Sequence, residues 1–418
     1  MPNRQFDAFV LGAGMVGIGT ALALQDAGRQ VALIDRRGPA QETSYGNAGL
    51  IQSEAIMPYA LPLNLGVILS TLAGRRTDAR VALGALWQTA PHLIAYARAS
   101  RPEVVARTAA ANVPLIREAV PAHKALSERA QAMHFWHLSG YLRLFRSNAP
   151  MDASFAEAEM IRERYDIPYN TLDADGLREA EPHIASDFVG ALHMPTPVRI
   201  DDPGGLGEAY EQLFEREGGT FLKGDALGLE KTADGFALDI GGERVTARQA
   251  VVCLGPWSGD LLSRFGVRMP LFVKRGYHRH YRPLGNAVLN HCIADDASGY
   301  ALAPQRRGIR LTTGAEFTRR DDPPSPIQLR RVEPIARTLF PLGEGVEETP
   351  WMGARPCLPD LLPAIGPLPG VEGLFANFAH QHHGFTLGPA TGRLVAAMMV
   401  GETPFANPAP YSPARFSR

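Results

Sequence analysis

The stretch that most constrains the fold of this 418-residue chain lies between Asp7 and Asp35. A short apolar run at residues 8–11 leads into Gly-Ala-Gly-Met-Val-Gly at residues 12–17, which has the spacing G-x-G-x-x-G. Small and apolar residues then recur at helical spacing, a second apolar run follows at residues 31–34, and Asp35 ends it. This order of strand, glycine turn, helix, strand and acid predicts a parallel βαβ unit that binds a dinucleotide.

Each residue of this fingerprint has a physical role. Gly12 permits the tight turn, Gly14 lets a pyrophosphate approach the backbone, and Gly17 allows the helix to pack closely on the strand. The N–H groups at the start of the helix favour the phosphates, and Asp35 can accept hydrogen bonds from ribose hydroxyl groups. The fingerprint alone leaves NAD and FAD as alternatives, because both carry the same ADP half.

Composition narrows the class of protein. With 45% hydrophobic and 20% charged residues, the chain is typical of a globular protein that is large enough for two domains. A net charge of -1 provides no basic surface for nucleic acid. The three cysteines, Cys253, Cys292 and Cys357, lack the spacing of metal ligands and are odd in number, so neither a disulfide framework nor a metal site is expected.

Two segments bear on location in the cell. The N-terminus enters the first strand almost at once, which argues against a signal peptide and favours a cytoplasmic protein. No uncharged apolar run reaches the roughly 18 to 20 residues of a membrane-spanning helix. We interpret Ala60 to Gly74, the nearest candidate, as a buried helix or flap, with an interfacial helix that touches the inner face of the membrane as the alternative.

The rest of the chain predicts a helical layer and further strands. Residues 85–181 have mainly helical spacing. Residues 220–254 predict short strands joined by turns at Asp234-Gly235 and Gly241-Gly242. Residues 267–311 alternate as the strands of a second sheet do, and that sheet can form a wall for a substrate.

Three other segments are placed to contact a cofactor. Residues 43–51 form a loop of small and polar side chains that can lie flat against a long planar molecule. Residues 250–258 run from an apolar strand through Gly255 into a helix start, where the backbone can approach a dinucleotide. A C-terminal helix is predicted to begin near Gly388, with Pro389 in its first turn, and its N-terminus can stabilise an anion.

Three histidines precede this helix at positions 380, 382 and 383. They invite a metal interpretation, but no carboxylate or cysteine lies at ligand spacing, and neighbours in a strand or loop do not converge readily on one ion. We therefore expect a glycine-flanked turn that lies beside a cofactor ring.

Five motifs together match one known family. They are the fingerprint at residues 12–35, Ser44-Tyr45-Gly46-Asn47-Ala48-Gly49, Arg275-Gly276-Tyr277-His278, Gly353-Ala354-Arg355-Pro356 and His383-Gly384-Phe385-Thr386-Leu387-Gly388-Pro389-Ala390-Thr391-Gly392. This set resembles the FAD-dependent D-amino-acid oxidase family, and most closely its bacterial D-amino-acid dehydrogenase branch. The resemblance implies FAD. It also implies a noncovalent flavin, because the flavin-linked cysteine of the sarcosine oxidase branch has no counterpart before Arg355.

The resemblance also implies an α/β fold in two interleaved parts. One is a Rossmann-like FAD-binding domain of the glutathione-reductase type, and the other is an α+β substrate domain with a mixed or antiparallel sheet. We expect residues 1–85, 187–268 and 349–418 to form the discontinuous FAD-binding domain. Residues 86–186 and 269–348 are expected to form the substrate domain.

The motifs and the resemblance give a set of candidate site residues. In relatives such as glycine oxidase, the arginine of the G-x-R-P turn binds the substrate carboxylate, and Arg355 stands at that position. Tyr300 and Tyr277 are the matches to tyrosines that close the pocket in relatives, and His383 completes the candidate catalytic set. The candidate cofactor-binding residues are Gly12, Gly14, Met15, Val16, Gly17, Asp35, Arg36, Arg37, Ser44, Asn47, Ala48, Gly49, Leu50, Ala226, Gly255, Trp257, Gly353, Gly384, Phe385, Thr386 and Leu387.

The predicted function is oxidation of the CH–NH bond of a D-amino acid to an imino acid, which hydrolyses to a 2-oxo acid and ammonia. Electrons then pass to a quinone or another acceptor. The alternatives are an oxygen-using amine oxidase of the glycine, sarcosine or D-hydroxyproline type, a non-catalytic FAD-binding subunit, and an NAD-dependent dehydrogenase. The loop at residues 379–383 lacks the Gly-His-Gly of many dehydrogenase relatives, so it does not identify the amino acid.

Overall fold

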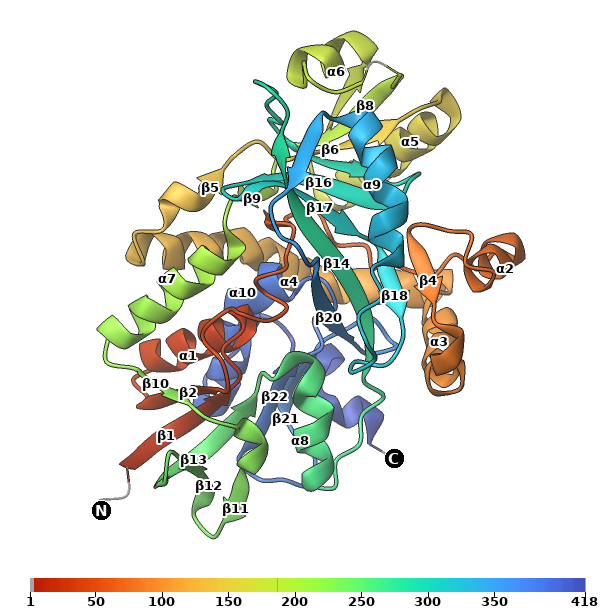
Figure 1. The fold of residues 1–418 in the computed structure, drawn as a ribbon. Helices are drawn as coiled ribbons and strands as arrows, with labels where there is room; N and C mark the ends of the chain where they lie inside the picture. Colours follow the sequence, from red (N-terminus) through yellow and green to blue (C-terminus); the bar gives the residue numbers. More distant parts are fainter. Residues whose placement is uncertain (1–3, 186, 418) are drawn as a thin grey trace.

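The computed structural model describes residues 4–185 and 187–417 (Figure 1). Within these residues the strands form a first sheet around the N-terminal fingerprint, a larger second sheet, and a small three-stranded sheet. The strands of the three sheets are interleaved along the chain. The three-stranded sheet consists of β3 (Leu50–Ile51), β5 (Trp136–His137) and β9 (Val198–Ile200).

The first sheet has a parallel centre in which β10, β2, β1, β13 and β22 lie side by side. The predicted βαβ unit is confirmed, because β1 and β2 pair in parallel and α1 connects them. The strands of this sheet are β1 (Arg4–Leu11), β2 (Val31–Asp35), β10 (Thr220–Lys223), β11 (Glu230–Thr232), β12 (Gly235–Ile240), β13 (Glu243–Val252), β21 (Ala364–Pro367) and β22 (Leu374–Phe378).

The predicted turns at Asp234-Gly235 and Gly241-Gly242 are also confirmed. They join β11, β12 and β13 into an antiparallel meander. Gly241 and Gly242 have φ values of 61° and 83°, which is the left-handed pair that a tight hairpin turn requires. Within the meander, β12 pairs with the first half of β13. The second half of β13 pairs with β22.

The second sheet is mixed and forms the other large layer of the molecule. Most of its strand pairs are antiparallel, while β15 pairs with β6 and β18 pairs with β4 in parallel. Its strands are β4 (Ala79–Val81), β6 (Tyr141–Phe145), β7 (Asn170–Asp173), β8 (Gly190–Met194), β14 (Phe272–Pro283), β15 (Cys292–Asp295), β16 (Tyr300–Gln305), β17 (Gly308–Thr313), β18 (Ala315–Phe317), β19 (Leu342–Gly345) and β20 (Trp351–Cys357).

Helices cover both layers (Figure 1). The segment predicted as mainly helical, residues 85–181, contains four helices but also supplies β6 and β7 to the second sheet. The helices are α1 (Met15–Asp26), α2 (Leu65–Leu72), α3 (Leu86–Ala99), α4 (Pro102–Arg129), α5 (Asn148–Tyr165), α6 (Ala174–Ala180), α7 (Pro203–Arg216), α8 (Ser258–Arg264), α9 (Ile327–Leu339) and α10 (Gly384–Val400).

The predicted start of the C-terminal helix is wrong by four residues, because α10 begins at Gly384 and Pro389 lies inside it. A proline has no N–H to donate to the carbonyl four residues earlier, which here belongs to Phe385. His123 of α4 fills that vacancy, with its Nε2 2.8 Å from the Phe385 oxygen. The buried histidine therefore satisfies a carbonyl group that the proline leaves free inside α10.

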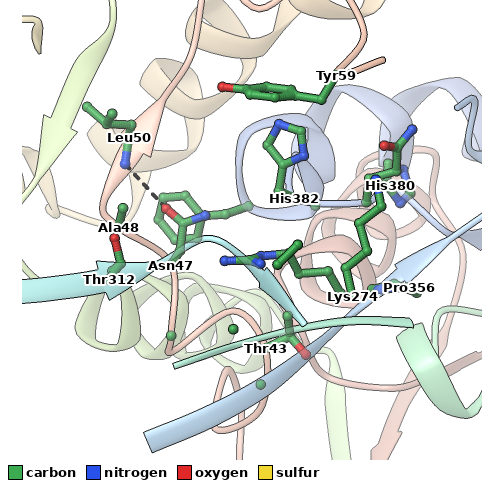
Figure 2. Close-up of a pocket in the computed structure, with 18 of the residues that line it drawn as sticks. Thr43, Asn47, Ala48, Leu50, Tyr59, Lys274, Thr312, Pro356, His380 and His382 are labelled. Carbon is green, nitrogen blue, oxygen red and sulfur yellow. Dashed lines mark hydrogen bonds between the residues drawn. The ribbon is translucent and has the colours of Figure 1, made fainter. Parts of the chain in front are cut away.

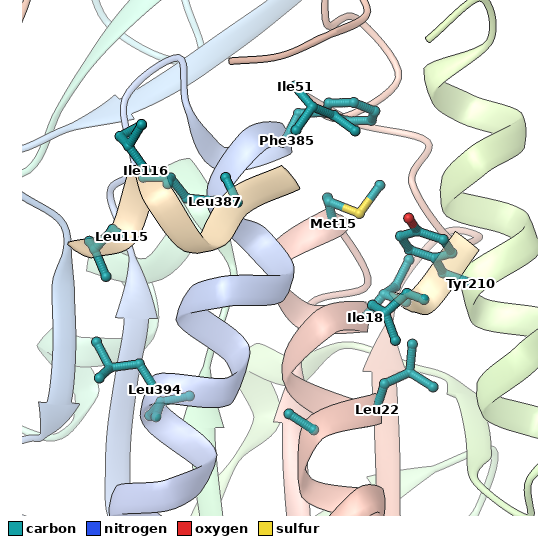
Figure 3. Close-up of a cluster of buried hydrophobic side chains, with 14 of the residues drawn as sticks. Met15, Ile18, Leu22, Ile51, Leu115, Ile116, Tyr210, Phe385, Leu387 and Leu394 are labelled. Carbon is teal, nitrogen blue, oxygen red and sulfur yellow. The ribbon is translucent and has the colours of Figure 1, made fainter. Parts of the chain in front are cut away.

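Helices α1 and α10 pack against each other backbone to backbone (Figure 3). A Cβ atom on Gly19 would lie 2.8 Å from the Pro389 Cα, and one on Gly392 would lie 2.5 Å from the Gly19 carbonyl carbon. A Cβ atom on Gly388 would lie 2.7 Å from the Met15 oxygen. Since residues ascend together along both helices, the helices are parallel and their N-termini lie at the same end.

The interpretation of Ala60 to Gly74 as a buried segment is wrong. Its helix, α2, has no buried residue, and Leu65 and Leu69 are 75% and 65% exposed. Among the described residues, no helix is long and apolar enough to cross a membrane. Most residues of α2 are apolar, and such a composition favours burial, so the sequence did not indicate that this helix is exposed.

The proposed division into domains remains a prediction. The sheets divide the chain differently in three places, because β4, β8 and β20 lie within the ranges expected for the FAD-binding domain yet belong to the second sheet. In addition, α4 lies in the range of the substrate domain but contributes Leu115 and Ile116 to the core cluster around α1 and α10.

The contact between α1 and α10 makes Gly19 a sensitive position. We expect Gly19→Ala to lower the free energy of unfolding by about 1–3 kcal/mol, because its methyl group would overlap the backbone of α10. Urea unfolding of the cofactor-free protein, followed by circular dichroism, measures this change.

Gly259→Ala is the matched control. Gly259 lies in another helix, α8, and a Cβ atom there would meet only the Leu271 side chain, at 3.6 Å. That substitution should be neutral or stabilise the protein by up to about 1 kcal/mol. Equal unfolding midpoints for the two variants would show that the backbone contact is not tight.

Candidate functional site

One cavity of about 830 Å³ extends from the end of the first sheet to the second sheet. Its wall includes the glycine turn, the loop that follows β2, and parts of β14 and β20. The predicted site residues on this wall are Gly12, Gly14, Met15, Val16, Asp35, Arg36, Ser44, Asn47, Ala48, Leu50, Ala226, Gly255, Trp257, Tyr277, Tyr300, Gly353, Arg355, Gly384 and Phe385.

The remaining predicted residues do not line this cavity. Gly17 and Gly49 are packed against backbone carbonyl groups, those of Gly12 and Ile200. Thr386 donates to the Leu50 oxygen at 3.2 Å, and Leu387 lies in the hydrophobic core. Arg37 and His383 also lie away from the wall.

The glycine turn has the geometry that its spacing predicts. Gly12 has a φ of 105°, and a Cβ atom there would lie 2.6 Å from the Cys253 oxygen. Gly17 would bring its Cβ atom into overlap with the Gly12 oxygen, so only glycine allows this helix to sit so close to the strand. Gly14 differs, because its Cβ atom would meet only the Ser44 Oγ at 3.3 Å and would otherwise point into open space.

Asp35 is held in place at the adenosine end. Its Oδ2 accepts a hydrogen bond from the Ala13 N–H at 2.8 Å, and its Oδ1 accepts one from the Arg37 N–H at 2.9 Å. A carboxylate has about four acceptor positions, so the group can still accept from ribose hydroxyls. Beside it, the Arg36 guanidinium lies 4.3 Å from the centre of the Trp257 ring, and both line the cavity.

The residues in the middle of the cavity fit a long, anionic cofactor such as FAD. The N-terminal turns of α1 and α10 both reach the wall, with Met15 and Val16 on one helix and Gly384 and Phe385 on the other. The Ser44 Oγ accepts from the Met15 N–H at 2.9 Å, which positions the loop after β2 beside the turn. Two helix N-termini on one cavity provide N–H groups and positive dipole ends for negatively charged groups.

Asn47 orders the loop that forms the next part of the wall. Its Oδ1 accepts from the Gly49 N–H at 2.8 Å and from the Leu50 N–H at 3.3 Å, the second of which is drawn in Figure 2. These two bonds hold the loop in shape, and it presents small side chains to the cavity.

Two cations line the part of the cavity that the second sheet forms, and of these Lys274 is buried and Arg355 is half-buried. Arg355 donates to the carbonyl oxygens of Gly314 at 3.1 Å and Thr313 at 3.4 Å. Lys274 stands directly opposite it in the pairing of β14 with β20, so both side chains project from the same face. No carboxylate of the described residues forms an ion pair with either cation, and such burial is costly unless an anion compensates it.

Lys274 is anchored by an aromatic side chain. Its Nζ donates to the Tyr96 hydroxyl at 2.7 Å and lies 4.0 Å from the centre of that ring. Burial, only partly offset by Cys357, lowers the pKa of Lys274 to about 8. The Tyr96 hydroxyl in turn donates to the Tyr59 oxygen, so this cation also fixes the loop that carries Tyr59.

The three histidines stay close together but differ in their access to the cavity: His380 and His382 line it, and the His383 ring, which does not, lies 3.9 Å from the His382 ring between centres. His382 lines the cavity and faces Tyr59 edge-on, with 4.3 Å between ring centres (Figure 2). His380 bonds the Thr391 hydroxyl at 3.0 Å. Burial, together with the nearby charges of His383, Arg355 and Lys274, holds the pKa of His382 well below its usual range, so its ring is neutral at pH 7.

The two predicted tyrosines do not bring their hydroxyl groups to Arg355. The Tyr277 hydroxyl donates to Glu316 Oε2 at 2.8 Å and accepts from the Ser325 N–H at 2.8 Å. The Tyr300 hydroxyl is buried without a hydrogen-bond partner among the described residues. The tyrosines that sequence reasoning missed are Tyr59, Tyr96 and Tyr141, which line the cavity from elements with no recognisable motif.

Comparisons with known proteins give a consistent match. The family model DAO, described as FAD dependent oxidoreductase, matches residues 7–398. The chain is 30% identical to a D-amino acid dehydrogenase of Sinorhizobium medicae (strain WSM419), covering 93% of this chain and 95% of the relative. It is 28% identical to a D-amino-acid oxidase of Bradyrhizobium diazoefficiens, covering both chains completely.

A similar fold is found among solved structures. Glycine oxidase from Geobacillus kaustophilus superposes over the full length of both chains with a TM-score of 0.75 and 20% sequence identity. At that identity the match bears on the fold alone. It agrees with the two-sheet α/β architecture expected from the sequence.

The open space at Gly14 allows a clean test of cofactor binding. Gly14 has φ -73° and ψ 174°, which valine can adopt, so Gly14→Val should fold. The branched side chain would occupy the space where a pyrophosphate must approach the turn. We expect this variant to purify without flavin while its far-ultraviolet circular dichroism stays unchanged. A folded variant with stoichiometric flavin absorbance would show that the turn does not hold the phosphates.

Proposed function

The chain belongs to the DAO family of FAD dependent oxidoreductases, and from this premise we propose that it oxidises a D-amino acid at its Cα–N bond. The product is an imino acid, which water hydrolyses to a 2-oxo acid and ammonia. The proposal follows the names of the two relatives, a D-amino acid dehydrogenase and a D-amino-acid oxidase.

The observation that carries this proposal is the half-buried Arg355 guanidinium in the same cavity as the glycine turn. Both of its hydrogen bonds to the protein go to neutral carbonyl groups. A planar guanidinium with free N–H groups binds a carboxylate through two parallel hydrogen bonds. A scaffold that only stores FAD has no use for such a group, which argues against a non-catalytic subunit.

The protein's own residues would bind and orient the substrate. FAD would lie along the glycine turn, Asp35 and the N-terminus of α10, and when bound it accepts the two electrons and the hydrogen of the Cα–H bond. Arg355 would hold the carboxylate, and the adjacent Lys274 adds positive charge at this end. His382 stays neutral beside Arg355, so it adds no competing cation and can accept a hydrogen bond from the amino group.

A panel of amino acids tests the substrate class. D- and L-amino acids, D-proline derivatives, glycine and sarcosine are mixed anaerobically with the protein, and flavin bleaching is measured. We expect D-amino acids to bleach the flavin fastest. Bleaching by L-isomers alone would overturn the assignment, and bleaching by glycine or sarcosine alone would favour the amine oxidase alternative.

Arg355 variants test the carboxylate contact. Arg355→Ala should retain FAD and lower kcat/KM for amino acids by roughly 30-fold to several thousand-fold, because a buried charged partner is lost. The kcat/KM of Arg355→Lys should lie between those of the parent protein and Arg355→Ala, since a lysine cannot form the bidentate pair. The control substrate is the corresponding amine without a carboxylate. If the amine loses as much activity as the amino acid, Arg355 does not anchor a carboxylate.

For the electron acceptor we propose a quinone in the membrane, reached through the exposed helix α2. Residues 58–61 line the cavity and lead directly towards this helix. The exposed side chains of Leu65 and Leu69, together with Trp87 at 91% exposure, can enter the interfacial layer. The exposed arginines at positions 75, 98 and 101 complement anionic lipid headgroups.

Vesicle binding measures this contact. We expect the protein to sediment with vesicles that contain phosphatidylglycerol, and the double variant Leu65→Ser with Leu69→Ser to bind at least about fivefold more weakly. Both proteins should reduce a water-soluble dye equally. If the variant sediments and reduces vesicle-bound quinone as well as the parent protein, α2 is not the contact.

A further inference from the structure

The cavity includes a further region that is not part of the contacts proposed above for the cofactor and the substrate carboxylate. Its wall there is formed by the loop after β3, by β6, by α5 and by the turn after β15. The ionisable side chains of this region are Glu54, Tyr59, Tyr141, Arg143, Glu157 and Asp296.

Glu54 is the unusual member of this group. It is 8% exposed, and its Oε1 accepts from the Gln52 Nε2 at 3.0 Å. Its Oε2 makes no hydrogen bond among the described residues, the Tyr141 side chain lies close to the carboxyl group, and no cation of those residues forms an ion pair with it. A buried carboxyl group with an unused oxygen on a cavity wall is costly without a ligand.

The other charges of the region do not compensate Glu54. Arg143 is occupied by Asp296, with 2.8 Å between Nε and Oδ2. Glu157 is exposed at the rim. Tyr59 and Tyr141 present aromatic rings, which also favour a cation.

The cavity therefore carries charges of both signs on different walls. Arg355 and Lys274 place two positive charges on β20 and β14, and Glu54 places an acid on the loop after β3. A substrate held by its carboxylate at Arg355 has its side chain free to extend into the rest of the cavity. Electrostatic complementarity then selects a side chain that ends in a positive charge.

We propose that Glu54 binds the cationic end of the substrate side chain, so that the preferred substrates are D-amino acids with a basic side chain, of the ornithine, lysine or arginine class. This specificity rests on the proposed function of the same cavity. Burial raises the pKa of Glu54 to about 7. A cationic ligand pairs with the ionised form, so binding strengthens as the pH rises through this value.

The test compares D-lysine with D-norleucine, a neutral substrate of similar shape, in anaerobic flavin reduction and in turnover. We expect kcat/KM at pH 8 to favour D-lysine by on the order of 10- to 100-fold, the range of a charge-assisted hydrogen bond. Glu54→Gln should reduce this ratio to near one. The ratio should rise between pH 6 and 8 in the parent protein and stay flat in the variant.

Glu211→Gln is the matched control. Glu211 is also a buried glutamate whose pKa is raised to about 7 by burial, but it lies on α7, and the cavity wall does not include it. This variant should keep the parental ratio and pH profile. Flavin content and circular dichroism confirm that each variant is folded and loaded.

The outcomes distinguish failure of the proposed preference for basic side chains from failure of the proposed oxidation of D-amino acids. Equal rates for D-lysine and D-norleucine would overturn the role of Glu54 and leave oxidation of D-amino acids intact. A preference for D-glutamate would overturn it too, and would assign the selectivity to Lys274. If no D-amino acid reduces the flavin, both the proposed function and the proposed role of Glu54 are overturned.

Discussion

The direct contact between the backbones of α1 and α10 is the constraint on which the site depends. Three glycines, Gly19, Gly388 and Gly392, remove the side chains that would otherwise separate the two helices. Because the helices run in parallel, their positive dipole ends both face the same cavity. Segments that are more than 360 residues apart in sequence thus form one binding surface for an anionic cofactor, which neither helix could form alone.

The charged residues of the cavity are arranged for a ligand, not for the stability of the empty protein. Some buried charges elsewhere are paired, as Arg275 and Glu316 show with 2.9 Å between Nη2 and Oε2, while Arg310 is buried without an ion pair among the described residues and donates to the His280 ring and to backbone oxygens. Arg355 and Lys274 lack such a partner, and each is desolvated at a cost to stability. What distinguishes Arg355 and Lys274 is that both line the cavity, so an anionic ligand bound there can supply the partner that the described residues do not.

The parts of this structure that follow local rules could be predicted from the sequence, and the parts that follow strand register could not. The glycine fingerprint and the Gly241-Gly242 hairpin depend on a few adjacent residues with special backbone conformations, so their spacing is sufficient. The orientation of Tyr277 depends on Glu316, a residue 39 positions away on another strand. No local pattern reports such a contact, and the same limit concealed Lys274, which faces Arg355 only because of how β14 pairs with β20.

The histidine turn shows how one non-local contact can change the chemistry of a site. The sequence predicts that the last helix begins near Pro389, since a proline is best tolerated in the first turn. With that start, the dipole end of the helix would lie about one turn further from His382. His123 instead satisfies the carbonyl that Pro389 leaves without a donor, and the helix extends back to Gly384. His383 then becomes the residue that precedes the helix, and His380 and His382 are the imidazoles on the cavity wall. A buried hydrogen bond from α4 thus accompanies a helix start that the local sequence did not indicate, and that start sets which histidines reach the cavity.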